Sequence, residues 1–249
     1  MNTKIIDVCA QLGSGDKKGD ILESGITVQK ILEHMDYAKV SKSVIYPVTW
    51  KNYKGKANLE ICEAVEKYPD RFIGFARVNP NSKDAEEILI EALDEYNFKG
   101  IRLRGYHDQF TMDSKGIERI FDIAKERKLP IAVDGEKDRS TLVRLVKEYP
   151  DLTIIIMHMG SFDNWDWKNT KAYAELIQVA PNFYMASCFF IIQSFLKNAL
   201  EKTPNKIIFG SDSPTLPPSM ELKRIETMEL EPDQYDMVAG GNLAKILCI

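Results

Sequence analysis

The chain has 249 residues, of which 44% are hydrophobic and 28% are charged, as in ordinary globular proteins. The formal net charge of −4 argues against a nucleic acid or an anionic membrane as a partner. No apolar stretch resembles a signal peptide or approaches the roughly 20 residues that span a bilayer. The four cysteines form no CxxC pair, and we expect a reduced protein in the cytoplasm.

Short apolar runs divide the chain and predict strands. They lie at residues 4–9, 42–48, 71–78, 99–104, 130–134, 152–158, 182–186 and 206–211. Between these runs, apolar residues recur at spacings of three and four, which predicts helices. The helices are expected at residues 28–39, 59–68, 85–96, 117–127, 142–149, 172–179, 195–200 and 235–247.

Alternating strands and helices imply a parallel sheet, and eight such units in 249 residues are the expected content of a (β/α)8 TIM barrel. The alternative is an open doubly wound sheet, which usually carries a glycine-rich turn after its first strand. Residues 9–16 read CAQLGSGD, without the third glycine of that turn. We therefore expect an α/β fold with one domain over residues 1–249, a TIM barrel with long loops at 12–26 and 159–169 over the catalytic face.

Several predicted strands end in residues that can do chemistry. Alternate residues of a strand share a face, and TIM-barrel active sites lie at the carboxyl ends of the strands. If these faces point inward, the following residues meet at the mouth of the barrel: Cys9, Gln11, Arg102, Arg104, Asp134, His158 and Asp212.

His158 and Asp212 are the candidates for proton transfer. His158 follows an apolar run and is either a hydrogen-bonded core residue or a general acid or base, because the pKa of histidine lies nearest neutrality. Asp212 precedes Ser213 and Pro214. It caps the next helix, binds a metal ion or orients His158.

Arg102 and Arg104 are two cations separated by one leucine on a strand that we expect to be interior. Buried guanidinium groups need anionic partners. Either Asp134 or Asp7 supplies the negative charge, or a substrate carboxylate does so in a bidentate pair.

Cys9 has three interpretations: a small core residue, a thiolate nucleophile close to His158, or a zinc ligand. Gln11 is a candidate for contacting the substrate from the same strand. Trp165 lies in the loop after the sixth strand and is a candidate for lining the pocket.

Motifs along the whole chain resemble those of the amidohydrolase-2 family, which is similar to aminocarboxymuconate-semialdehyde decarboxylase. The matching segments are IIDVCAQ at 5–11, YPDRFIGFARVNP at 68–80, KGIRL at 99–103, PIAVDG at 130–135, HMG at 158–160, FGSDSP at 209–214 and NLAK at 242–245. The resemblance implies a TIM barrel with one zinc or manganese ion. It also implies metal ligands from two first-strand histidines, a fifth-strand histidine and an eighth-strand aspartate, and a catalytic histidine after strand six.

This chain departs from that ligand set. Cys9, Gln11 and Asp134 stand where the family has histidine, while Asp212 and His158 keep the family's residues. Thiolate and carboxylate groups also bind zinc, so Cys9, Asp134 and Asp212 form an alternative ligand set. Balance of the carboxylates by Arg102 or Arg104 is the other interpretation.

These observations lead to three hypotheses. The first is a hydrolase of a small carboxylated substrate, such as a lactone, in which His158 moves the proton and the two arginines hold the carboxylate. The second is a decarboxylase or another carbon–carbon lyase of the same family. The third is a relative without catalytic activity that binds a small acid. The sequence leaves the oligomeric state open, and a homodimer is one candidate because relatives commonly form dimers.

Overall fold

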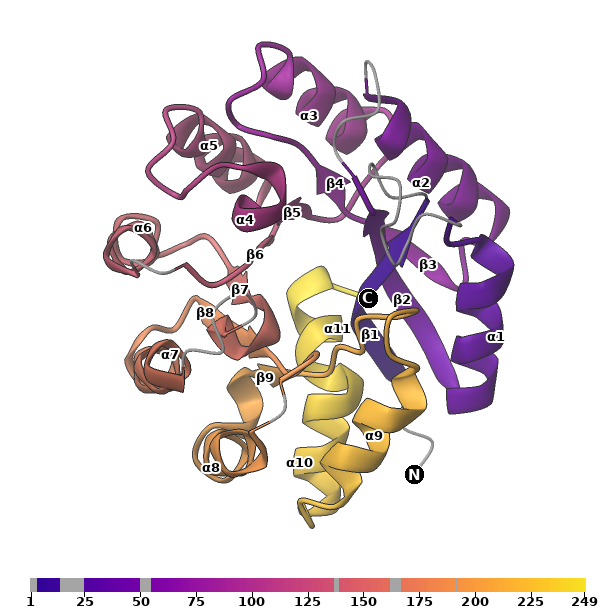
Figure 1. The fold of residues 1–249 in the computed structure, drawn as a ribbon, viewed down its shortest axis with the longest axis vertical. Coiled ribbons are helices and arrows are strands. Elements are labelled where there is room, and N and C mark those ends of the chain that lie inside the picture. The colour runs from indigo at the N-terminus through magenta and orange to yellow at the C-terminus, as the bar shows by residue number, and fades with distance from the viewer. Residues whose placement is uncertain (1–3, 14–24, 50–54, 137–138, 162–166, 191) are drawn as a thin grey trace.

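The computed structural model describes residues 4–13, 25–49, 55–136, 139–161, 167–190 and 192–249, with parallel strands at the centre and helices around them (Figure 1). The strands are β1 (Ile5–Leu12), β2 (Val40–Pro47), β3 (Phe72–Gly74), β4 (Ala76–Arg77), β5 (Ile101–Leu103), β6 (Ile131–Val133), β7 (Ile154–Ile156), β8 (Phe183–Ala186) and β9 (Ile207–Ile208). The α-helices are α1 (Val28–Ala38), α2 (Lys56–Lys67), α3 (Ala85–Asp94), α4 (Gly105–Asp108), α5 (Ile117–Arg127), α6 (Ser140–Glu148), α7 (Trp167–Val179), α8 (Gln193–Lys202), α9 (Pro218–Glu226), α10 (Pro232–Asp236) and α11 (Asn242–Leu247).

Hydrogen bonds between neighbouring strands close a ring. The pairing is parallel and follows chain order within β1–β3 and within β4–β9. The ring closes where the amide of Val8 donates to the carbonyl of Phe209 at 3.1 Å and the amide of Gln11 donates to the carbonyl of Ser213 at 2.8 Å. The predicted (β/α)8 barrel is confirmed.

The strand predicted at 71–78 is interrupted at Phe75 and appears as β3 and β4. The amide of Phe75 donates to Ile45 of β2 at 3.0 Å, and the amide of Ala76 donates to Gly100, just before β5, at 2.9 Å. The strand therefore changes its pairing partner within two residues. Its two parts still link β2 to β5.

Alternation along the short strands sorts side chains into two apolar layers. Ile131 and Val133 of β6 pack in the layer that includes the helices, whereas Ala132 belongs to a second cluster. On β5, Ile101 and Leu103 likewise pack outward, which leaves Arg102 facing the interior of the barrel. The fold therefore places this guanidinium inside.

Strand β7 corrects one prediction. The strand expected at 152–158 ends at Ile156, which packs in the outer layer, and Met157–Gly160 forms a 3-10 turn (η2). His158 therefore does not share a strand face with Ile156. It has a φ of 53°, in the left-handed region, because the chain turns sharply after the strand.

The last predicted helix also differs. Residues 235–247 form parts of α10 and α11, joined by a π-helical turn, Met237–Gly241 (η4). This turn presses against β1, since a Cβ atom on Gly240 would lie 2.0 Å from the carbonyl oxygen of Lys4. Helix α9 was not expected from the sequence. Within the described ranges, every helix is too short or too polar to cross a membrane.

Candidate active site

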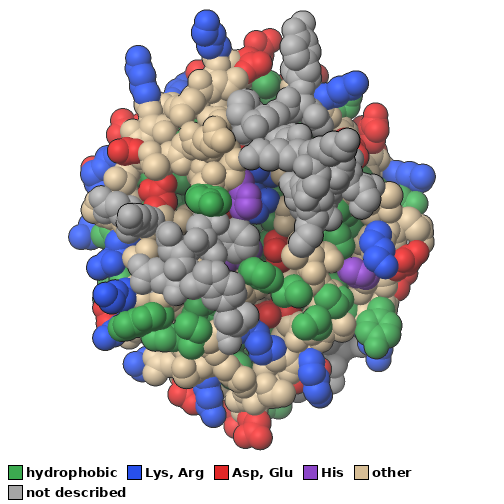
Figure 2. All heavy atoms as spheres, in the orientation of Figure 1, with side chains coloured by type: hydrophobic (Ala, Val, Ile, Leu, Met, Phe, Trp, Pro, Cys, Tyr) green, Lys and Arg blue, Asp and Glu red, His purple; other side chains and the backbone are tan. Residues whose placement is uncertain are grey.

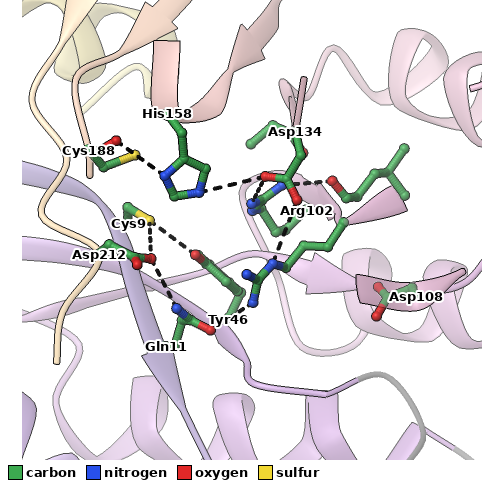
Figure 3. Close-up of polar contacts among 12 residues, drawn as sticks. Cys9, Gln11, Tyr46, Arg102, Asp108, Asp134, His158, Cys188 and Asp212 are labelled. Atoms are coloured by element: carbon green, nitrogen blue, oxygen red, sulfur yellow. Dashed lines mark hydrogen bonds and ion pairs between the residues drawn. The ribbon is translucent and has the colours of Figure 1, made fainter. Parts of the chain in front are cut away.

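The residues predicted to meet at the barrel mouth do meet there, one after another around the ring (Figure 3). Cys9 and Gln11 come from β1 and Arg102 from β5. The others stand one to four residues after the ends of β5, β6, β7 and β9. Each is at most 4% exposed: Cys9, Gln11, Arg102, Arg104, Asp134, His158 and Asp212. Trp165 lies outside the described residues. In Figure 2, a histidine and basic side chains are visible in a hollow near the centre of the face.

Asp134 is the anionic partner of both arginines. Nη2 of Arg102 donates to Oδ1 of Asp134, and Nε of Arg104 lies 3.7 Å from Oδ2. Burial raises the pKa of Asp134, but the two guanidinium charges outweigh that effect and hold the pKa well below its usual range. Arg102 also donates to the carbonyl of Leu103 at 2.7 Å, and its guanidinium carbon lies 5.3 Å from the ring centre of Tyr46.

Asp7, the other candidate partner, has a different role. Its carboxylate accepts hydrogen bonds from the amides of Cys9 and Ser211, each at 2.9 Å, and from the Ser211 hydroxyl. These bonds tie β1 to the segment after β9. Burial is the larger effect and raises the pKa of Asp7 to about 7.

A chain of hydrogen bonds leads from Arg104 to Asp212. Nη1 of Arg104 donates to Oε1 of Gln11 at 2.8 Å, and Nε2 of Gln11 donates to Oδ1 of Asp212 at 3.0 Å. The Cys9 thiol donates to the same Oδ1 at 3.4 Å and hydrogen-bonds with the Tyr46 hydroxyl at 3.1 Å. Burial raises the pKa of Asp212, although the charge of His158 opposes this.

His158 lies among acidic groups. Its Nε2 is 3.7 Å from Oδ1 of Asp134, and its Nδ1 lies 3.2 Å from the carbonyl oxygen of Cys188, to which a protonated Nδ1 donates (Figure 3). Burial lowers the pKa of His158, but the negative charges of Cys188, Asp212 and Asp134 prevail and raise it to about 9. The imidazole is therefore protonated at neutral pH.

Cys188 and Tyr46 belong to this cluster, and the sequence reasoning missed both. Cys188 is fully buried. Burial raises the pKa of its thiol, but hydrogen bonding with Cys9 and the charge of His158 lower it well below the ordinary value. A signal was present in the sequence: Cys188 stands two residues after β8, just as His158 stands two residues after β7.

The residues at the family's ligand positions do not fit a metal ion. Oδ1 of Asp134 accepts from Arg102, and Oδ1 of Asp212 accepts from Gln11 and Cys9. Burial raises the pKa of the Cys9 thiol well above its ordinary value, whereas zinc binds the thiolate. Within the described part of the chain, no group of three or more His, Cys, Asp or Glu side chains has a geometry suited to a metal ion.

Solved structures with the same fold span the whole chain. The 5-carboxyvanillate decarboxylase of Sphingomonas paucimobilis is 16% identical, with a TM-score of 0.77 and coverage of 99% of each chain. A dihydroxybenzoic acid decarboxylase of Polaromonas sp. JS666, with bound manganese and the inhibitor 2-nitroresorcinol, is 16% identical, with a TM-score of 0.76 and coverage of 99% of this chain and 97% of its own.

A probable 2-pyrone-4,6-dicarboxylic acid hydrolase of Acinetobacter baumannii, with bound citric acid, is also 16% identical. Its TM-score is 0.75, and the match covers 99% of this chain and 100% of the other. No curated protein matches the chain in sequence. The Amidohydro_2 family model, described as Amidohydrolase, matches residues 37–248, and the chain therefore belongs to the amidohydrolase family.

Proposed function

We propose that the protein is a hydrolase of a small carboxylated substrate, with a lactone of a polycarboxylic acid as the expected class. One observation carries the proposal: the imidazole of His158, the carboxyl group of Asp212 and the guanidinium of Arg104 lie in one buried cluster at the barrel mouth. An acid, a base and a fixed cation are what hydrolysis of an ester bond requires.

Arg104 is suited to hold the substrate carboxylate. One edge of its guanidinium is engaged with Gln11, while its Nε makes no hydrogen bond within the described residues. A carboxylate oxygen of the substrate would accept a hydrogen bond from this guanidinium group. The protonated imidazole of His158 adds a second positive charge, so the site suits an anionic ligand.

The proton transfers follow from the same geometry. Among the described residues, Oδ2 of Asp212 accepts no hydrogen bond, and it can take the proton of a water molecule as the water oxygen bonds to the lactone carbonyl carbon. The carbonyl oxygen gains negative charge, which the adjacent cations stabilise. The ring C–O bond then breaks, and the imidazolium of His158 gives its Nε2 proton to the leaving oxygen.

Decarboxylation is the second candidate, because a histidine protonated at neutral pH can deliver a proton to the carbon that loses carbon dioxide. Two of the three solved structures described above are decarboxylases of carboxylated aromatic compounds by name. In this chain the arginines would hold the substrate while His158 protonates the ring carbon.

Product analysis on two substrate panels separates these reactions. One panel holds lactones of dicarboxylic and tricarboxylic acids, and the other holds carboxylated phenols. Hydrolysis in ¹⁸O-labelled water places the label in the new carboxylate, whereas decarboxylation releases carbon dioxide and places a solvent proton on carbon. We expect His158→Gln and Asp212→Asn to abolish lactone opening, and the control His34→Gln, outside the cluster, to retain it.

Two results would contradict the proposal. Turnover that survives both substitutions would remove His158 and Asp212 from the reaction. Stabilisation by carboxylic acids, without turnover in either panel, would favour the third hypothesis, a relative that only binds a small acid.

A further inference from the structure

Arginine side chains link the positions at which the family holds its metal ion. Arg104 lies between two of them, with its Nε 3.7 Å from Oδ2 of Asp134 and its Nη1 2.8 Å from Oε1 of Gln11. Arg102 contacts Asp134 from its other carboxylate oxygen. Two separate strand ends are therefore joined through a guanidinium group.

The residues that replace the family's histidines are suited to this arrangement. Asp134 accepts from one guanidinium and faces another, and a neutral histidine there would leave both buried cations without an anion. Gln11 accepts a hydrogen bond from Arg104 and donates one to Asp212, so its amide connects the guanidinium to that carboxylate. The amide oxygen of Gln11, the atom with which it could bind a metal ion, is instead the acceptor for Arg104.

Charge balance leads to the same conclusion. Arg102 and Arg104 carry two positive charges, as one divalent ion would. Both face the carboxylate of Asp134, and Arg104 is linked to the carboxylate of Asp212 through Gln11. The guanidinium group is less strongly hydrated than an ammonium group and offers five donors in a fixed plane. It can therefore be buried where several acceptors meet.

We propose that Arg102 and Arg104 together take the place of the divalent cation in this barrel, so that the folded protein excludes zinc and manganese from its mouth. The positive charge that a family member obtains from a metal ion comes here from two side chains. This inference concerns cation binding, and its tests use no substrate, so its failure is distinguishable from failure of the proposed hydrolase activity.

The first test uses the wild-type protein, purified without an affinity tag or chelator. We expect elemental analysis to find zinc, manganese and iron far below one ion per chain. Addition of zinc or manganese should leave the melting temperature unchanged. A stoichiometric metal ion in the purified protein, or stabilisation by either added ion, would overturn the proposal.

The second test removes one cation. Arg104→Ala leaves Asp134 and Asp212 with less positive charge, and we expect added zinc or a low concentration of guanidinium ion to raise the melting temperature of this variant. Arg119→Ala is the control, because Arg119 is exposed and pairs with Glu86 on the surface. The proposal is wrong if Arg104→Ala responds to neither cation, or if Arg119→Ala responds equally.

A conservative variant covers the case in which Arg104→Ala does not yield soluble protein. Arg104→Lys retains the positive charge, and we expect it to fold and to bind no zinc by equilibrium dialysis. Binding of zinc to Arg104→Lys would show that a fixed charge at this position does not exclude the metal, and the inference would fail.

Discussion

Deprotonation of His158 is expected to destabilise the protein as the pH rises. The pKa of His158 is raised from 6.5 to about 9, since burial is outweighed by the charges of Cys188, Asp212 and Asp134. The stabilisation is therefore fully present below about pH 6.5 and is lost as the pH rises through about 9. At about 1.4 kcal/mol for each pH unit between these values, the contribution is about 3 kcal/mol.

Urea denaturation between about pH 6 and pH 10 measures this contribution as a change in the free energy of unfolding. We expect the wild-type protein to lose stability across this window and His158→Gln to lose much less. His34→Gln is the matched control, because burial lowers the pKa of His34, the opposite direction to the shift at His158. Parallel profiles for wild type and His158→Gln would show that His158 does not cause the loss of stability.

Three further predictions test the surroundings of His158. Asp7→Asn should raise the melting temperature at about pH 8 but not at about pH 4. Burial raises the pKa of Asp7 to about 7, so the stability that the protonated carboxyl group contributes to the fold is lost as the pH rises through that value. Gly135→Ala should lower the free energy of unfolding, measured by urea denaturation, by about 1–3 kcal/mol, since its Cβ atom would lie 2.1 Å from the carbonyl oxygen of Gly160. Cys188→Ser should lower the pKa of His158, measured by NMR titration of its imidazole, and an unchanged value would contradict the assigned cause.

The barrel could be predicted because its pattern is repeated and local. Each short apolar run is followed by an amphipathic helix, and the ring then depends only on the order of the strands. The interruption at Phe75 could not be predicted, because it reflects the change of pairing partner from β2 to β5. Helix α9 was missed because it begins at the second of two consecutive prolines, Pro217 and Pro218, and such a pair resembles a loop.

The residues that make up the site could also be predicted, whereas the hydrogen bonds and ion pairs between them could not. Strand ends fix which residues approach the mouth, and this placed Arg102 near both Asp7 and Asp134. The choice between them depends on the position of each along its strand. Asp134 follows the end of β6 and reaches the guanidinium, whereas Asp7 lies near the start of β1 and accepts from Ser211. His158 is a similar case, because its direction is set by a left-handed backbone that periodicity does not reveal.

The buried charges favour a functional role for this cluster over a purely structural one. An apolar replacement of a buried ion pair is often neutral or stabilising, so the Arg102–Asp134 pair is not explained by stability alone. The interior of the barrel shows that this chain can fill such space with apolar side chains, as Ala132 and Ile155 do beside the pair. Charges concentrated where the strands end, with a raised pKa of His158 among them, support the proposed function.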